Sequence, residues 1–374
     1  MKAAVYKQYG GPEVVQMEEI ARPVPGKGEI LVRIGAAGVT TADWRLRAAA
    51  FPGLISTVAG RLMFGVLRPR KRVLGSDFAG TIAEVGEGVT EFAVGDRVFG
   101  FQFGGAHAEY AVVKADGAVL KTPEILGDVE AAALPFGALC ALEFLDRFAG
   151  VKPGEKVLIV GASGGVGAYA VQVAKALGAE VTGVASGERA ELVTGLGANR
   201  FVDYRATPPE ALSGPFDVVF DTVGALSYPQ AAHMLAAGGR FVPLNFGVAE
   251  MGKFRQARRN GHEIILKVNS DSKEGLRRLT AMIAEGRLHP VIDRIYPFAA
   301  IREAYAHVES RSRKGAVVLD LAPARTCRAG PMPCYCVQRT SVRSLACVGE
   351  FSHRPSMAAF ATPVLASWNR KPLT

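Results

Sequence analysis

The chain has 374 residues, of which 49% are hydrophobic and 21% charged, a balance typical of a soluble globular protein rather than a fibrous or disordered one. Its formal net charge is +9, but residues 322–374 hold seven arginines and lysines against one acid, so residues 1–321 carry only +3. Nucleic-acid binding needs a basic face, and the one tight basic cluster before residue 322, at 68–72, indicates a solvated loop. We therefore do not expect nucleic acid as a partner.

Cysteine usage indicates a reducing compartment. Cys140 is the only cysteine before residue 322, and one thiol cannot build a disulfide framework. The first residues lack the basic segment and apolar core of a signal peptide, and no apolar stretch is long enough to span a bilayer. We expect a cytoplasmic protein without a membrane span.

The sequence changes texture along its length. Up to about residue 120, short alternating stretches such as EILVRIGAAG and GDRVFGF are separated by glycine-rich turns, which predicts a small β-rich, barrel-like domain. From about residue 156, Val/Ile-rich strands alternate with helical stretches: KVLIVGA precedes GVGAYAVQVAKALG, and DVVFDTVG precedes ALSYPQAAHMLAAG. This alternation predicts a doubly wound α/β domain with a parallel sheet buried on both faces. A last helix, SKEGLRRLTAMIAEG, and a last strand, GAVVLDL, indicate a return to the first domain.

A glycine loop follows the first strand of the α/β domain. In the dinucleotide-binding pattern G-x-G-x-x-G, glycines allow a tight turn, close approach of the pyrophosphate and close helix packing. Here an alanine stands where the first glycine is expected. The alternative is a glycine-rich turn without a ligand, but the strand-loop-helix context favours a cofactor site. The predicted cofactor-binding residues of this loop are Ala162, Ser163, Gly164, Gly165, Val166 and Gly167.

The next strand, EVTGVAS, decides which dinucleotide is expected. An NAD site places an acid about 20 residues after the loop, at the strand end, whereas an NADP site offers hydroxyl and cationic donors to the 2′-phosphate. No acid ends this strand; Ser186 and Arg189 are suitable phosphate ligands, and Tyr204 could border the adenine. The alternatives are a helix cap for Ser186 and a solvated charge for Arg189, and Glu188 could turn inward. The pattern favours NADPH.

Residues 154–175, GEKVLIVGASGGVGAYAVQVAK, match the signature of quinone oxidoreductases and ζ-crystallin, and GVTTAD, LGSDFAG and HAEYAVV add support. Over residues 1–321 the chain resembles a zinc-independent medium-chain dehydrogenase/reductase of the quinone oxidoreductase/ζ-crystallin-like subfamily. The resemblance implies an α/β fold class in which a GroES-like β-rich catalytic domain (1–122) precedes a Rossmann NADP-binding domain (123–269). Residues 270–321 are then a return to the catalytic domain, the substrate cleft lies between the domains, and a homodimer is the usual assembly.

Metal-dependent relatives have a cysteine at the position matching Thr40 and a histidine at the position matching Ser76, so we expect no metal. Oxidising an alcohol requires an alkoxide to be stabilised, a task that zinc performs. A quinone or an α,β-unsaturated carbonyl compound needs less help, because it spreads the arriving charge onto oxygen. We therefore expect an NADPH-dependent reductase acting on such small molecules. The alternatives are an NADPH-binding scaffold or RNA-binding crystallin-like protein with little turnover, and an NAD(P)-dependent alcohol dehydrogenase.

The resemblance also suggests catalytic residues. Thr40 is the candidate donor to the developing oxyanion, with Trp44 and Arg45 at the pocket wall; alternatively, Thr40 only caps the helix that follows. Asn245 and Phe246 match the region that holds the nicotinamide, although Asn245 could simply close a turn.

Two further segments lie outside these motifs. Residues 51–72 separate GVTTADW from LGSDFAG and are predicted either as a flap over the cleft or as a packed surface insertion. Residues 322–374 do not fit the family, and we interpret them as a foreign, mostly disordered extension; Cys334 and Cys336 lack a second pair for a metal site.

Overall fold

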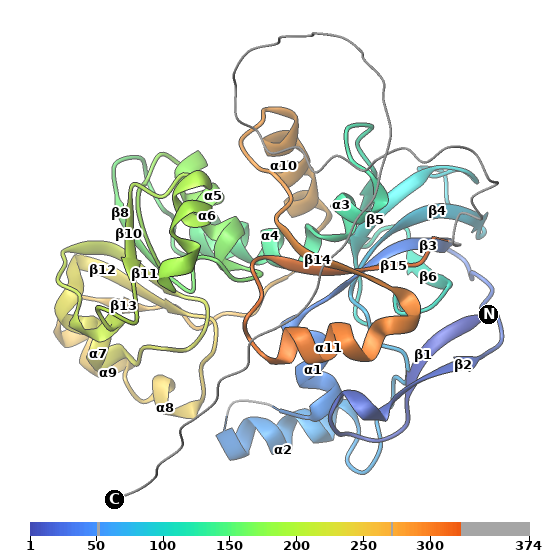
Figure 1. The fold of residues 1–374 in the computed structure, drawn as a ribbon, viewed down its shortest axis with the longest axis horizontal. Helices are drawn as coiled ribbons and strands as arrows, with labels where there is room; N and C mark the ends of the chain where they lie inside the picture. The colour runs from blue at the N-terminus through green and yellow to red at the C-terminus, as the bar shows by residue number, and fades with distance from the viewer. Residues whose placement is uncertain (51–52, 271, 323–374) are drawn as a thin grey trace, which may run out of the picture. The chain divides into compact units, whose positions relative to one another are not determined.

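The computed structural model describes residues 1–50, 53–270 and 272–322, which belong to one compact unit (Figure 1). The predictions for the tail at 323–374, including the cysteine pair, lie outside the described residues.

One antiparallel-rich sheet forms the β-rich part predicted for the start of the chain. Its strands follow the order β14-β15-β3-β4-β5-β7, with β6 paired to β3, so strands from both ends of the described chain lie in one sheet. Strands β1 and β2 form a separate antiparallel pair. The strand bounds are β1 (Lys2–Tyr6), β2 (Val15–Glu19), β3 (Glu29–Val39), β4 (Asp77–Val85), β5 (Arg97–Phe101), β6 (Tyr110–Lys114), β7 (Val119–Lys121), β14 (Ile292–Pro297) and β15 (Ala316–Asp320).

Three helices accompany this sheet: α1 (Thr41–Ala48), α2 (Gly53–Phe64) and α11 (Ile301–Glu309). Helix α11 buries Ile301, Ala304, Tyr305 and Val308, a spacing that places all four side chains on one helical face. This face joins a core shared with Trp44 and Leu46 of α1. Figure 1 shows α1 directly below α11.

The second sheet is entirely parallel and has the strand order β10-β9-β8-β11-β12-β13. The order reverses between β8 and β11, and ligands of doubly wound sheets bind at the carboxyl ends of strands at this reversal. The prediction of a doubly wound parallel sheet is confirmed. The strand bounds are β8 (Lys156–Val160), β9 (Glu180–Ala185), β10 (Arg200–Asp203), β11 (Phe216–Asp221), β12 (Leu235–Pro243) and β13 (Glu263–Ile264).

The remaining helices pack around and between the sheets. Side chains of α4 and α5 share one core with Phe99 of β5 and with β8, so both sheets are covered by a continuous apolar interior. Their bounds are α3 (Asp128–Ala132), α4 (Pro135–Leu142), a π-helix (Glu143–Phe148), α5 (Gly167–Ala176), α6 (Ala190–Gly195), α7 (Tyr228–Ala231), α8 (Val248–Met251), α9 (Phe254–Arg259) and α10 (Lys273–Ala284). Short 3₁₀ turns occupy Pro12–Val14, Gly187–Arg189, Pro209–Ala211, Ala232–Met234 and Phe298–Ala300.

One predicted helix is wrong in extent. The stretch ALSYPQAAHMLAAG predicts a long helix, but α7 covers only Tyr228–Ala231 and β12 begins at Leu235. Gly238 has a φ of +75°, a left-handed conformation that a helix does not accommodate, and β12 pairs irregularly with β11 in this region.

Candidate active site

The glycine loop connects β8 to α5 at the point where the strand order reverses. Gly161 has a φ of +83°, and a Cβ on it would lie 2.6 Å from Thr222 Oγ1. A Cβ on Gly167 would lie 2.0 Å from the Gly161 carbonyl oxygen, so helix and strand meet closely here. The tight turn is therefore made by Gly161. This explains why the next position tolerates Ala162, which is fully buried.

A cavity of about 100 Å³ lies between this loop and α1. Trp44 and Arg45 of α1 line it, so the structure brings these two predicted residues against the predicted cofactor loop. The other lining residues are Thr41, Gly164, Gly165, Val166, Thr222, Val223, Val308, Arg311 and Arg313.

Arg313 is a component of this cavity that the sequence analysis missed. Its Nη2 donates to Thr41 Oγ1 at 2.6 Å, and its Nη1 donates to the Val39 carbonyl oxygen at 3.4 Å. A Cβ on Gly165 would lie 2.8 Å from the same Nη2. Burial lowers the pKa of Arg313 to about 10, which leaves it charged at neutral pH. The only hint in the sequence is the basic run RSRK before the last strand.

Two more guanidinium groups line the cavity, those of Arg45 and Arg311. Burial, and secondarily the charge of Arg311, lowers the pKa of Arg45. Since three cations converge on a loop of glycine backbone, the cavity is suited to an anion such as a pyrophosphate.

Asn245 follows β12 and faces the same region. Its Oδ1 accepts a hydrogen bond from Arg45 Nη2 at 3.1 Å, which links the end of a parallel strand to α1. Phe246, the next residue, is partly buried. The loop after β11 is held by the buried carboxylate of Asp221, which accepts from the backbone N–H groups of Val223, Gly224 and Leu226 at 2.7–3.0 Å. Burial raises the pKa of Asp221, and these hydrogen bonds oppose the shift.

A second group of predicted residues lies where β9 and β10 end. Ser186 is buried, and its hydroxyl donates to Glu188 Oε1 at 3.3 Å. Arg189 Nη2 donates to the Ser312 carbonyl oxygen at 2.9 Å, while its Nη1 is buried without a hydrogen-bond partner among the described residues. Tyr204 is exposed beside Arg205, whose guanidinium lies 6.0 Å from the tyrosine ring centre. Arg205 is a second cation that the sequence analysis missed.

Comparison with known proteins identifies the family of the chain. The family model described as Alcohol dehydrogenase GroES-like domain matches residues 26–124, and the one described as Zinc-binding dehydrogenase matches residues 196–319. A chloroplastic quinone-oxidoreductase homolog of Spinacia oleracea is 31% identical over 340 residues, which cover 86% of this chain and 98% of that protein. The chain belongs to the quinone oxidoreductases of the medium-chain dehydrogenase/reductase family.

Other members of this family extend the comparison. The NADPH-dependent alkenal/one oxidoreductase of Arabidopsis thaliana chloroplasts is 31% identical, with 86% of this chain and 80% of that protein covered. Among solved structures, the quinone oxidoreductase of Coxiella burnetii has a TM-score of 0.76 and 28% identity, covering 86% of this chain and 99% of that one. The recognition of the family from the glycine-loop signature, and the predicted GroES-like and Rossmann parts, are confirmed.

Thr40 and Ser76, which match metal ligands of zinc-dependent family members, both contact one buried carboxylate in this oxidoreductase. The Thr40 hydroxyl donates to Asp43 Oδ2 at 2.6 Å, and the Ser76 hydroxyl donates to Asp43 Oδ1 at 3.3 Å. The Asp43 backbone N–H donates back to Thr40 Oγ1 at 3.2 Å, which forms a capping box at the start of α1. Hydroxyl groups are poor zinc ligands, so these positions do not fit the metal named by the family model. Within the described residues, no group of three His, Cys, Asp or Glu side chains could hold a metal.

A second cavity of the oxidoreductase, of about 250 Å³, lies on another side of α1. Asp43 and Leu46 of α1 line it together with Phe64 of α2, Leu74 and Phe103. Most of its lining surface is apolar, and the stacked rings of Phe64 and Phe103, 5.4 Å apart, form part of the wall. The segment at 51–72, predicted as a flap or as a packed surface insertion, thus contributes α2 to this cavity, although Phe51 and Pro52 lie outside the described residues.

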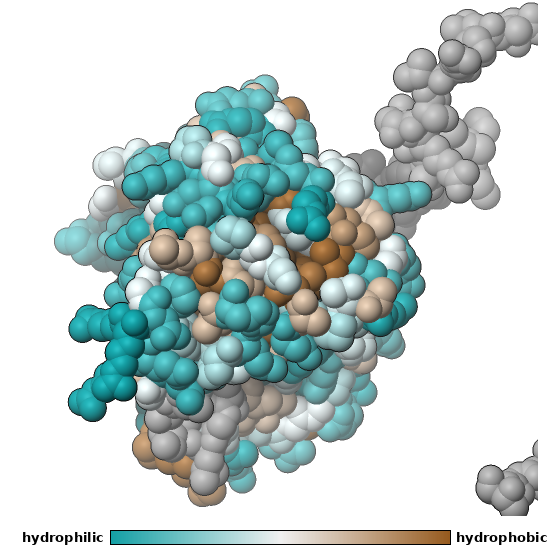
Figure 2. Space-filling model, turned by 90° about the vertical axis from the view of Figure 1, so that its left-hand side faces the viewer, coloured by the Kyte–Doolittle hydropathy of each residue, from teal (hydrophilic) through white to brown (hydrophobic). Residues whose placement is uncertain are grey.

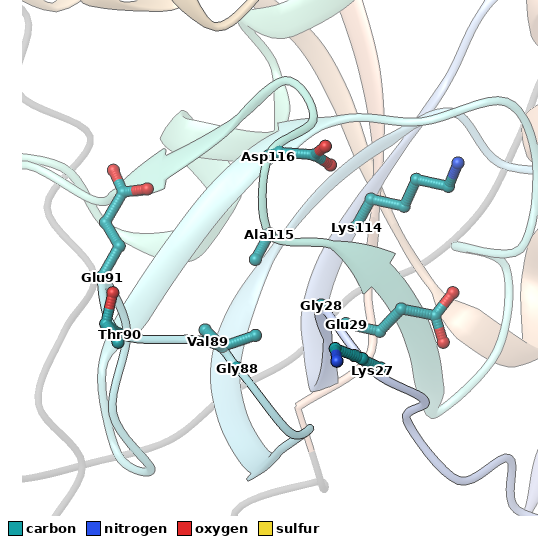
Figure 3. Close-up of a pocket in the computed structure, with 10 residues that line it drawn as sticks. All are labelled: Lys27, Gly28, Glu29, Gly88, Val89, Thr90, Glu91, Lys114, Ala115 and Asp116. Carbon is teal, nitrogen blue, oxygen red and sulfur yellow. The ribbon is translucent and has the colours of Figure 1, made fainter.

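A groove of about 410 Å³ lies between three turns of the antiparallel-rich sheet, at residues 27–29, 88–91 and 114–116 (Figure 3). Its charged residues are Lys27, Glu29, Glu91, Lys114 and Asp116, and Figure 3 shows Glu91 and Lys114 pointing away from each other. Because charges of both signs alternate and do not converge, we assign no function to this groove.

Proposed function

We propose that this oxidoreductase transfers hydride from NADPH to a quinone or an α,β-unsaturated carbonyl compound without a metal. The observation that carries the proposal is the cavity in which Arg45 and Trp44 of α1 face the glycine loop beside buried Arg313. One wall of this cavity is the glycine loop with its neighbouring arginines, which suits an anion, and the opposite wall is α1, which accompanies the antiparallel-rich sheet.

The residues present fit a dinucleotide. Gly164 and Gly165 expose backbone to the cavity, and a side chain at Gly165 would collide with the Arg313 guanidinium. Arg313 is therefore positioned to neutralise the pyrophosphate, and Thr41 and the Val39 carbonyl oxygen fix its orientation. The backbone N–H groups at the start of α5 add a positive helix end.

The preference for NADPH over NADH is supported by the charges near the end of β9. Arg189 keeps a buried nitrogen without a partner among the described residues, and Arg205 lies nearby beside Tyr204. A 2′-phosphate would give these cations an acceptor. Glu188 is the acid that could instead bind the ribose hydroxyls of NADH. Its side chain is 58% exposed, and its Oε1 lies 3.8 Å from Arg189 Nη2 and 3.7 Å from Arg205 Nη2, so its carboxylate is paired with these two cations.

The chemistry assigned to the protein is positioning and charge stabilisation. NADPH, when bound, supplies the hydride. Arg45 is the cationic donor that α1 contributes to the cavity, and Asn245 accepts a hydrogen bond from its guanidinium. Trp44 supplies an apolar wall, which strengthens each polar interaction inside. Thr40 stays a predicted oxyanion donor. In the structure its hydroxyl donates a hydrogen bond to Asp43, as expected for the alternative in which Thr40 only caps α1.

A conjugated acceptor suits these walls better than a simple alcohol. Its oxygen receives charge that one guanidinium can stabilise, and its apolar body can lie against Trp44 in the same cavity. Relatives named quinone oxidoreductase and 2-methylene-furan-3-one reductase support this substrate class. A homodimer and a cytoplasmic location remain predictions; several relatives are named chloroplastic or mitochondrial.

The test is oxidation of NADPH, followed by absorbance, with quinones, enones, simple aldehydes and alcohols as partners, each with and without a chelator and repeated with NADH. We expect turnover with quinones or enones that the chelator does not change. Absence of turnover with every acceptor would favour a scaffold, and chelator-sensitive alcohol oxidation would contradict the metal-free assignment.

A further inference from the structure

An apolar and basic surface lies over α2 and the helices α8 and α9, which we call the α2–α9 surface. Its large apolar side chains are exposed to solvent, and Leu67 is 86% exposed. Helices α2 and α8 are in contact and lie side by side at the lower edge of Figure 1, and apolar surface is visible at the same level in Figure 2. The exposed apolar residues of this surface are Val58, Leu62, Met63, Val66, Leu67, Met251 and Phe254.

The same surface is strongly cationic. Residues 61–72 contain five arginines and lysines and no acid, and residues 250–259 contain four against one acid, Glu250. All nine of these cations are exposed. Three of them make contacts with the rest of the protein: Arg61 stacks on the Tyr9 ring at 5.1 Å, Arg70 donates to the Met63 carbonyl oxygen at 3.2 Å, and Lys71 donates to the Phe103 carbonyl oxygen at 2.5 Å.

The apolar cavity of about 250 Å³ reaches this surface. Met63, Arg70 and Lys71 are exposed members of the α2–α9 surface, and all three also line the cavity. An apolar molecule on the outer side of α2 therefore lies next to an apolar space that extends to Asp43 and Ser76 on the inner side.

We propose that the α2–α9 surface docks on an anionic lipid bilayer. Basic side chains around exposed aliphatic ones match anionic headgroups above an apolar interior. A second copy would bring nine cations against nine in a two-fold contact, which is repulsive. Single-stranded nucleic acid is bound largely by aromatic stacking. Six of the seven exposed apolar residues of this surface have no ring, and the neighbouring exposed ring of Phe103 is already stacked on Phe64. Docking stands on this surface alone; uptake of a lipophilic quinone or enone from the bilayer rests also on the proposed function.

The test is co-sedimentation of the full chain with vesicles of phosphatidylcholine and with vesicles in which about three parts in ten are phosphatidylglycerol. We expect binding to the anionic vesicles only, weakened by salt. The double variant Leu62→Glu/Leu67→Glu should bind at least tenfold more weakly, and so should Arg68→Gln/Arg72→Gln. The matched controls Val24→Glu/Ile125→Glu, two other exposed apolar positions, and Lys152→Gln/Lys156→Gln should bind like the parent chain.

Activity separates docking from catalysis. With a water-soluble quinone and no vesicles, all four variants should turn over as the parent does, because none of the substituted residues lines either cavity. Equal vesicle binding by the parent and the Leu62→Glu/Leu67→Glu variant would overturn the proposal. So would failure of the parent to sediment with anionic vesicles, or binding of a single-stranded oligonucleotide in its place. These outcomes are independent of whether any quinone is reduced, so docking can fail while the proposed function holds.

Discussion

Nη2 of Arg45 donates a hydrogen bond to Oδ1 of Asn245 over 3.1 Å, although 200 residues separate the two in the chain. Arg45 belongs to α1 and Asn245 follows β12 of the parallel sheet. Since Arg45 also lines the cavity in which hydride transfer is proposed, the bond connects a residue of that cavity to the end of β12. It makes the position of a cationic donor depend on the parallel sheet.

Removing either partner should weaken cofactor binding and turnover together. We expect Arg45→Ala and Asn245→Ala each to raise the Kd for NADPH about tenfold, the effect of losing a charged hydrogen bond of about 1.4 kcal/mol. The double variant should show far less than a hundredfold effect, because both changes remove the same bond. Fluorescence titration with NADPH measures all three. Full additivity would show that the bond is not made in the bound state.

Discrimination between NADPH and NADH should depend on Arg189. We expect Arg189→Ala to lower kcat/KM for NADPH about 30-fold, which corresponds to about 2 kcal/mol for a charged hydrogen bond. The same variant should change kcat/KM for NADH about twofold at most, because NADH has no 2′-phosphate. Glu188→Gln should raise kcat/KM for NADPH, because it removes the carboxylate that is paired with Arg189 and Arg205. Arg200→Ala, an exposed arginine at the other end of β10, is the control. An equal loss with both cofactors would contradict a phosphate-binding role.

The overall architecture was accessible to sequence reasoning because it depends on local patterns. Val/Ile runs bury a strand on both faces, and a glycine loop between strand and helix marks the cofactor turn. Arg311 and Arg313 were not accessible in this way. They lie more than 140 residues after the loop, and only the return of β15 beside β3 brings Arg313 against Gly165. The extent of α7 was also missed, since an alanine-rich stretch favours a helix by propensity and pairing with β11 overrides it.

Gly167 should be intolerant of a side chain for a packing reason. A Cβ added at this position would lie 2.0 Å from the Gly161 carbonyl oxygen. The contact is with backbone on the strand side, so it can be relieved only if α5 moves away from β8. We expect Gly167→Ala to lower the free energy of unfolding by about 2 kcal/mol. In Gly195→Ala the new Cβ meets nothing within 4 Å at an exposed helical position, so this control should gain about 0.5 kcal/mol. Urea unfolding measures both; a tolerated Gly167→Ala would mean that the turn relaxes.

Thr40 offers a direct choice between capping and catalysis. Loss of the cap in Thr40→Ala should cost about 1 kcal/mol of stability, and Thr40→Ser should recover it. Because the hydroxyl proton is donated to Asp43, we expect kcat to fall less than about tenfold. Loss of an oxyanion donor costs about 100-fold or more. A loss of that size in Thr40→Ala, with recovery in Thr40→Ser, would instead establish Thr40 as the donor.

The free energy of unfolding should depend on pH through His107. This side chain is fully buried; its Nδ1 accepts from the Tyr305 hydroxyl at 3.1 Å and its Nε2 donates to the Gly38 carbonyl oxygen at 2.9 Å. Burial lowers the pKa of His107 below its ordinary value of 6.5, while the charge of Asp43 and the bond to Gly38 oppose the shift. Below pH 6.5 the unfolded chain therefore takes up a proton that the folded chain does not.

Since the unfolded state binds the extra proton, acidification below pH 6.5 should remove stability, by at most about 1.4 kcal/mol per pH unit from this group. His107→Gln should make the free energy of unfolding less dependent on pH in this window, even if it lowers stability overall. The difference between variant and parent, measured by urea unfolding from about pH 7 to pH 5, isolates the histidine from carboxylates common to both. His262→Gln is the control, because its ring is only partly buried and a weaker effect is expected. Parallel pH profiles for His107→Gln and the parent would show that the folded chain protonates His107 as readily as the unfolded chain does.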